Sequence, residues 1–360
     1  MVILIFFSGT SFYSEHITGN EAWRKLESAH IAFEDNELGA ALLYCEQAKV
    51  QHTKTISGYI SDLRTSLSPS EVKQAGDDLQ SVYAVLVKRN DLAALEILDA
   101  VFLNHPVEYF GKSIQALLLW LEKRLVYPEA DFLTGKIYEA EGENFLALAN
   151  YRKAWENKEF LEIPDERYSL AYRMADLSFI MGQKGEQEKY LLLVLLNDPL
   201  YGKPGDESPT LEAMLRTVEI DPTLEKFFSL YRHSNYIALK AYQNLAELYQ
   251  EANNNGRAVA LATLAASISV THLAEAVKQA DFSYVYSGLN DLFIRSRRNN
   301  EISVWASERK LFDSFLIFAS ILNERGSREQ AISLWTSLSL YCSDKTVSLE
   351  ASRLLELSRL

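Results

Sequence analysis

The segment GKIYEAEGENFLALANYRKAW, residues 135–155, decides the fold because its small and aromatic residues recur at the spacing of a helical hairpin. Gly135 is placed where two paired helices approach most closely, and Gly142 is expected to end the first helix. Ala147 and Tyr151 then fall on one stripe of the second helix. The segment therefore predicts two antiparallel helices joined by a short turn.

The same arrangement recurs along the chain. Residues 171–199, 241–266 and 316–338 repeat it, and residues 26–49 and 82–106 are weaker copies. Amphipathic helices of any kind would show similar apolar spacing. Periodicity alone, however, does not predict a Gly or Asn at each turn, nor a Pro after a helix. Such residues stand here at Asn36, Gly182, Gly326, Pro106, Pro199 and Pro222.

This spacing resembles the tetratricopeptide repeat (TPR) family. The resemblance implies an all-α fold, a right-handed superhelical solenoid of antiparallel helical hairpins. The intervals between the copies depart from the regular repeat of that family, so we expect additional helices between them. A low content of Gly (15) and Pro (8) among 360 residues also favours helices.

The overall charge and the cysteines exclude several classes of function. A net charge of -13 argues against nucleic acid as a partner, because phosphate binding needs a dense basic surface. Cys45 and Cys342 are far apart in the sequence, which predicts neither a disulfide framework nor a zinc site. Both are expected to be small buried residues.

The ends and joints of the chain predict its organisation. Residues 1–14 contain a short apolar run followed by small residues, which we interpret as an export signal. The alternatives are a disordered N-terminus, or a buried first strand or helix turn of a cytoplasmic protein. No apolar stretch of membrane-spanning length is identified beyond it, so no transmembrane segment is expected. The Pro- and Gly-rich loop at 197–210 divides the chain into an N-terminal array, 15–200, and a C-terminal array with a capping helix, 201–360.

Catalytic and metal-binding motifs are not found. Glu27 and His30 have the spacing of a di-iron helix, but the second copy that such a site requires is missing. The GKS at 111–113 lacks the preceding glycine of a phosphate loop. We therefore expect a protein without enzymatic activity, cofactor or metal. Converging buried carboxylates with strongly shifted pKa values would reopen the question of catalysis.

The resemblance also implies a binding face. In TPR proteins the first helix of each pair lines a concave groove, and the corresponding positions of this chain are Phe132, Lys136, Glu139, Tyr172, Asp176, Phe179, Gln243 and Glu247. The rings of Phe132, Tyr172 and Phe179 are the preferred binding patch, because rigid aromatic side chains dominate many interfaces. The alternative is that these rings pack between hairpins.

These features together predict a non-enzymatic scaffold or adaptor. It would bind a protein or peptide in its concave groove and, if exported, would work in a bacterial periplasm or cell envelope. An alternative is a helper protein of a transport or envelope complex that encloses a small hydrophobic solute in a closed cavity. Self-association through a terminal hairpin is a further expectation, because the end of an array exposes apolar surface.

Overall fold

The computed structural model describes residues 21–66, 118–196, 198–201 and 208–358. Every regular element in these ranges is a helix, and no strand occurs among them, so the predicted all-α class is confirmed. The predicted copy at 82–106, the N-terminal segment 1–14 and half of the loop at 197–210 lie outside the described residues.

The chain forms two compact units, Met1–Leu177 and Ser178–Leu360. The division falls inside one helix, α10, whereas the sequence analysis placed it after residue 200. In unit 1 the described helices are α3 (Glu21–Glu34), α4 (Leu38–Ser66), α8 (Pro128–Ala140), α9 (Asn144–Glu156), η3 (Lys158–Phe160) and the first part of α10 (Glu166–Ile180).

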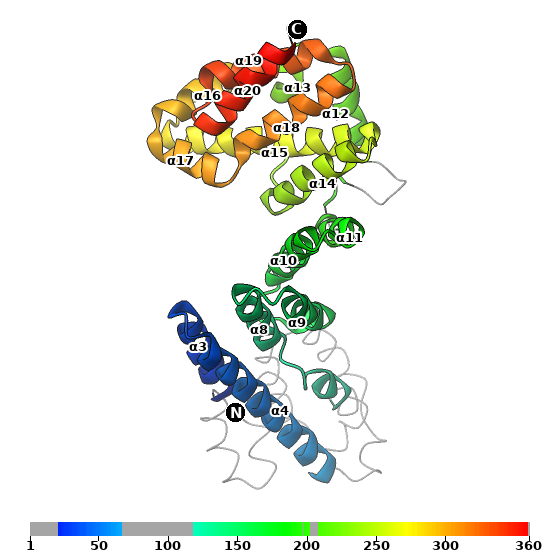
Figure 1. The fold of residues 1–360 in the computed structure, drawn as a ribbon, viewed down its shortest axis with the longest axis vertical. Helices are drawn as coiled ribbons and strands as arrows, with labels where there is room; N and C mark the ends of the chain where they lie inside the picture. The colour runs from blue at the N-terminus through cyan, green and yellow to red at the C-terminus, as the bar shows by residue number, and fades with distance from the viewer. Residues whose placement is uncertain (1–20, 67–117, 197, 202–207, 359–360) are drawn as a thin grey trace, which may run out of the picture. The chain divides into compact units, whose positions relative to one another are not determined.

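Helices α3, α4 and α8 of unit 1 lie side by side (Figure 1). Small side chains form much of the core between them. Ala29, Ala41, Cys45, Ala48 and Ala130 are all fully buried there. Side chains of this size allow helix axes to approach closely. The close packing places one face of α3 beside α8, where the candidate site lies.

Unit 2 is built around α15, the long helix drawn in yellow in Figure 1. It packs against α12, α14, α16, α17 and α18. The described helices of unit 2 after α10 are α11 (Lys184–Leu195), α12 (Pro209–Ile220), α13 (Glu225–Leu230), η4 (Tyr236–Ala238), α14 (Leu239–Glu251), α15 (Asn255–Ala280), α16 (Leu289–Arg298), α17 (Asn300–Glu308), α18 (Leu311–Glu324), α19 (Arg328–Tyr341) and α20 (Lys345–Ser358).

Helix α15 is an apolar stretch that the sequence analysis overlooked. It is long and apolar enough to cross a bilayer, but 83% of its most apolar window is buried inside the protein. A core helix of a globular domain has the same properties, since its neighbours cover it on all sides. Length and composition therefore do not distinguish a membrane span from a core helix here.

Five helix-to-helix turns in the described ranges share one backbone geometry. Each has a residue of positive φ that donates its N–H to the carbonyl three residues back, while the next residue donates to the carbonyl five back. This is the Schellman motif, in which a left-handed residue satisfies the last carbonyls of a helix. The left-handed residues are Asn36, Gly142, Gly182, Asn253 and Gly326. The predicted turns at Asn36, Gly142, Gly182 and Gly326 are thus confirmed.

The pairing of α8 with α9 depends on Gly135. A Cβ at this position would collide with the ring of Tyr151, which is fully buried. Gly135→Ala is expected to lower the free energy of unfolding of unit 1 by about 1 to 3 kcal/mol, because the ring must shift in a packed interior. Urea denaturation followed by circular dichroism measures the change.

Gly58→Ala is the matched control for this prediction. Gly58 is exposed in α4, and nothing lies within 4 Å of a Cβ placed there. Alanine is expected to raise the free energy of unfolding by about 0.5 to 1 kcal/mol, because it is the better helix former. Equal effects of the two substitutions would contradict the close α8–α9 packing.

Candidate functional site

An open cavity of about 220 Å³ lies in unit 1 between α3, α8, the loop at 161–165 and the first turn of α10. Its lining combines carboxylates, one lysine, one histidine and apolar side chains. Three stretches of sequence supply them.

Helix α3 supplies a stripe of three exposed residues. Trp23, Glu27 and His30 are spaced by four and three positions, so they lie on one face of the helix. The adjacent face holds Ala22 and Leu26, which pack into the core and fix the orientation of the helix. The stripe therefore forms the outer wall of the cavity.

Helix α8 supplies the inner wall through Glu129, Phe132 and Lys136. Glu129 lies in the first turn, where the helix dipole favours negative charge. Phe132 is 3% exposed, and its ring meets the Tyr151 ring edge-on at 5.7 Å. The Lys136 ammonium lies 4.1 Å from the centre of the Phe132 ring.

The loop that leads into α10 completes the cavity. The backbone N–H of Glu162 donates a hydrogen bond of 2.7 Å to Glu129 Oε1, which ties the loop to α8. Ile163 follows at the rim, and Glu166 opens α10. Ile163 is 58% exposed and Trp23 is 46% exposed, so the mouth of the cavity carries two uncovered apolar side chains.

The protonation of the inner wall is unusual. Burial raises the pKa of Glu129 to about 7, and the negative charges of Glu162 and Glu166 add to this, although the hydrogen bond from Glu162 opposes it. Burial also raises the pKa of Glu166. Burial and the neighbouring Arg173 lower the pKa of Lys136. The cavity therefore disfavours the charged forms of Glu129, Glu166 and Lys136.

This arrangement predicts that Glu129 costs stability at neutral pH. The folded state binds its proton up to about pH 7 and the unfolded chain only to about pH 4.5, so the free energy of unfolding falls as pH rises between these values. Glu129→Gln is expected to raise the free energy of unfolding of unit 1 at pH 8 by on the order of 1 to 3 kcal/mol, and to change it little at pH 4. Urea titrations at both pH values measure this; a loss of stability at pH 8 would contradict it.

Of the residues predicted from sequence, Phe132 and Lys136 are brought together in this cavity. Glu139, one turn further along α8, accepts hydrogen bonds from Tyr151 and, at 2.8 Å, from Arg173. Tyr172 and Asp176 are half-buried on α10, and neither lines the cavity.

The remaining predicted residues lie in unit 2. Phe179 is 65% exposed near the end of α10. Gln243 is buried and donates to the Lys310 carbonyl and to Ser314 Oγ at 2.8 and 2.7 Å, so it joins α14 to α18. Glu247 is exposed on α14. The ring of Phe132 is buried against Tyr151 of the same hairpin, whereas the ring of Phe179 is exposed.

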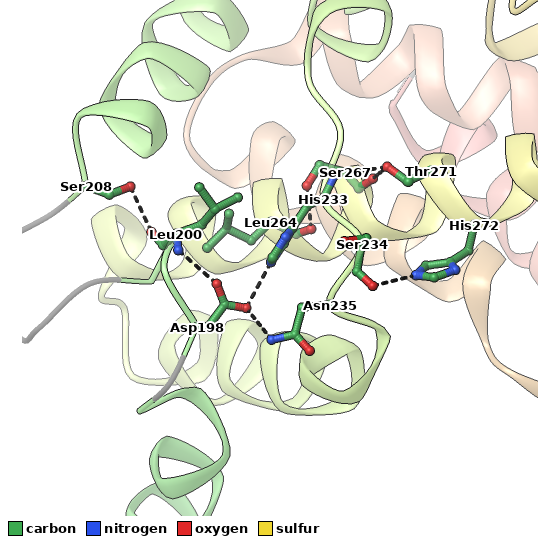
Figure 2. Close-up of polar contacts among 10 residues, drawn as sticks. All are labelled: Asp198, Leu200, Ser208, His233, Ser234, Asn235, Leu264, Ser267, Thr271 and His272. Carbon is green, nitrogen blue, oxygen red and sulfur yellow. Dashed lines mark hydrogen bonds and ion pairs between the residues drawn. The ribbon is translucent and has the colours of Figure 1, made fainter.

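A second polar cluster lies in unit 2 around the buried side chains of Asp198 and His233 (Figure 2). Asp198 accepts hydrogen bonds from His233 Nε2 at 2.9 Å, from the Leu200 N–H at 2.9 Å and from Asn235 at 2.8 Å. The backbone N–H of His233 donates a hydrogen bond of 3.0 Å to the hydroxyl of Thr271 on α15. These bonds fasten the segments around Asp198 and His233 to α15, which is a structural role.

Metal ligation finds no support in the part of the chain that the structure describes. No group of three or more His, Cys, Asp or Glu side chains there is placed to hold a metal ion. Cys45 and Cys342 are free and buried, as predicted.

Several cavity residues were missed from sequence. Trp23, Glu129, Glu162, Ile163 and Glu166 come from three separate segments, and only the packing of α3 beside α8 brings them together. The spacing of Trp23, Glu27 and His30 on one face of α3 could have indicated a binding surface. Glu27 and His30 were considered only as metal ligands.

The fold and cavity define an all-α protein of helical hairpins with an acidic cavity in its N-terminal unit. The chain is 37% identical over 329 residues to a protein of Treponema pallidum (strain Nichols) described as uncharacterized; the alignment covers 91% of this chain and 88% of that protein. The two belong to one family. No family model matches the chain.

Proposed function

We propose that this protein is a non-enzymatic, TPR-like helical scaffold that binds a protein or peptide partner by holding one of its side chains in the cavity between α3 and α8. The observation that carries the proposal is a small cavity that combines carboxylates with apolar walls and has Trp23 and Ile163 uncovered at its mouth. Partly exposed aromatic anchors around a pocket are typical of peptide-binding surfaces.

The size of the cavity favours a peptide over a whole small molecule. Pockets that enclose a drug-sized ligand have volumes of about 300 to 1,000 Å³. This cavity, at about 220 Å³, has room for one amino-acid side chain. A hydrophobic solute, as in the alternative proposal, would also remove water from the carboxylates without offering them a hydrogen bond, which costs free energy.

The hairpin turns support the repeat architecture. Five Schellman turns recur in the part of the chain that the structure describes, and a solenoid of stacked hairpins is the arrangement that such repeats form in TPR proteins. Work in a bacterial periplasm or cell envelope remains a proposal that rests on the apolar run in residues 1–14.

A labelling experiment tests binding at the cavity. Full-length protein is used to select ligands from a displayed library of random nonapeptides. Ile163→Cys is then labelled with a bulky maleimide, since both native cysteines are buried. Labelling at Ile163 is expected to abolish binding of the selected peptides.

The control is the variant Ile220→Cys, which carries the same maleimide label; Ile220 is 70% exposed in unit 2. The selected peptides are expected to bind to this labelled variant as they bind to the unlabelled protein. Peptides that bind equally well to both labelled proteins would place the binding surface elsewhere. Failure to select any peptide with folded protein would overturn the proposal.

One observation favours a second candidate function. Glu129, with a pKa of about 7 in a cavity with other carboxylates, has the protonation of a general acid or base. A proton-transfer enzyme acting on a peptide or a similar substrate is therefore the alternative. Mass spectrometry of the selected peptides after incubation distinguishes the two: unchanged masses support binding, and a change that Glu129→Gln abolishes supports catalysis.

A further inference from the structure

We infer that the side chain held in the cavity is basic, a lysine or arginine of an extended segment of the partner. This inference rests on the proposed function and names the chemistry of its ligand. Four observations carry it: the charge balance of the lining, the placement of its lysine, the apolar walls and the uncovered rim.

The charge balance favours a cation. Glu27, Glu129, Glu162 and Glu166 line the cavity against a single lysine, Lys136. Among the described residues none of these four carboxylates lies within 4.0 Å of a basic side chain, whereas other glutamates of unit 1, such as Glu139 with Arg173 at 2.8 Å, are paired. A cationic group from outside would supply the missing partner.

The lysine of the cavity lies over an aromatic ring of the same wall. Its ammonium lies over the Phe132 ring at 4.1 Å from the centre, and it forms no ion pair with the described residues. A cation above an aromatic face is stabilised by the ring itself. Lys136 therefore forms no ion pair with the carboxylates of the cavity, although its charge acts on Glu166 and partly opposes the rise in the pKa of that carboxyl.

The walls suit the stem of a long basic side chain. Leu26, Leu133 and Phe132 are buried and form the apolar part of the lining. Lysine and arginine bury their methylene groups against such surfaces while the charged end meets polar groups. Trp23 and Ile163 at the rim would contact apolar residues that flank the basic one.

Other cations and anions are less suitable. A metal ion needs a converging set of ligands, and the described residues contain no such group. An acidic side chain would be repelled by the carboxylates and by the net charge of -13. A basic segment is attracted by the carboxylates of the cavity and by the negative net charge of the protein.

The test begins with the peptides selected from the random library. Each selected Lys or Arg is replaced by norleucine, which keeps the length of lysine without its charge, and affinity is measured by fluorescence anisotropy with full-length protein. We expect norleucine at one position to weaken binding by about 10- to 100-fold, the range of a charge-assisted contact.

Variants of the protein show where the charge acts. Glu129→Gln with Glu166→Gln is expected to remove the preference for lysine over norleucine. The matched control is Glu141→Gln with Glu143→Gln, two exposed glutamates at the α8–α9 turn that do not line the cavity. The control is expected to keep the preference, and circular dichroism checks that both double variants are folded.

The dependence of peptide affinity on pH provides an independent test. Glu27, His30, Tyr127, Glu162, Glu166 and Lys136 surround or line the same cavity as Glu129. Loss of the Glu129 proton as pH rises from 6 to 8 adds one negative charge to the inner wall. The lysine peptide should bind more tightly over this interval, and the norleucine peptide should not.

The outcomes separate the inference from the proposed function. Selected peptides without a required Lys or Arg, which still lose binding on labelling at Ile163, would overturn the inference and leave the proposed function standing. No selected peptide would overturn both. n-Butylamine that binds as tightly as the lysine peptide would show that a free amine, not a peptide segment, is the ligand.

Discussion

Replacement of His233 by alanine is expected to lower the free energy of unfolding of unit 2 by about 2 to 4 kcal/mol. The Asp198 and His233 side chains are 0% and 6% exposed, and they are joined by a hydrogen bond of 2.9 Å. Without the imidazole the Asp198 carboxylate stays buried with one partner fewer. Urea denaturation at pH 7 measures the loss.

His272 provides the control for this prediction. It also donates a ring hydrogen bond, at 3.0 Å to the Ser234 carbonyl, but it is only half-buried. His272→Ala is expected to cost less than about 1 kcal/mol. Equal losses for the two histidines would contradict the role of the internal network that Figure 2 shows.

The contribution of this network depends on pH in a defined direction. Burial by itself would raise the pKa of Asp198, but the hydrogen bonds from His233, Leu200 and Asn235 outweigh it and hold the pKa below its ordinary value. A carboxyl with a lowered pKa stabilises the fold above its ordinary value near 4 and loses this effect as pH falls through the lowered one. The cost of His233→Ala should therefore be smaller at pH 3 than at pH 7.

Replacement of Trp23 by alanine is expected to weaken binding of the selected peptides by about 30-fold, which corresponds to about 2 kcal/mol. The indole is 46% exposed at the mouth of the cavity, so a bound segment would cover it. The stability of unit 1 should change little, because the side chain is not part of the buried core. Anisotropy titrations and urea denaturation measure the two effects.

Ile31→Ala is the matched control. Ile31 is 55% exposed on the same helix but does not line the cavity. Its replacement is expected to leave peptide affinity unchanged. A loss of affinity in both variants would indicate a general effect on α3, and no loss in either would remove Trp23 from the binding surface.

The hairpins were predictable because their signals are local. Gly142, Gly182 and Gly326 take the left-handed conformation that ends a helix, and a glycine adopts it at no steric cost. The close approach of Gly135 to Tyr151 follows from the spacing within one hairpin. Such features need only a few consecutive turns of chain.

The cavity was not predictable because its parts are distant in sequence. The periodicity of a helix shows which residues share a face, but it does not show what covers that face. Phe132 was therefore assigned to a groove, whereas Tyr151 covers its ring. Gln243 reads as a polar surface residue, yet α18 buries it and supplies its hydrogen-bond partners.

Hydrogen exchange of the full-length protein, with and without a selected peptide, tests the central claim most directly. If the peptide binds at the cavity, amides of α3, of the first turns of α8 and of residues 161–166 should exchange more slowly in its presence. The same segments in the Trp23→Ala variant should be protected less. Protection confined to residues 209–358 would contradict the account, because the binding surface would then lie in unit 2.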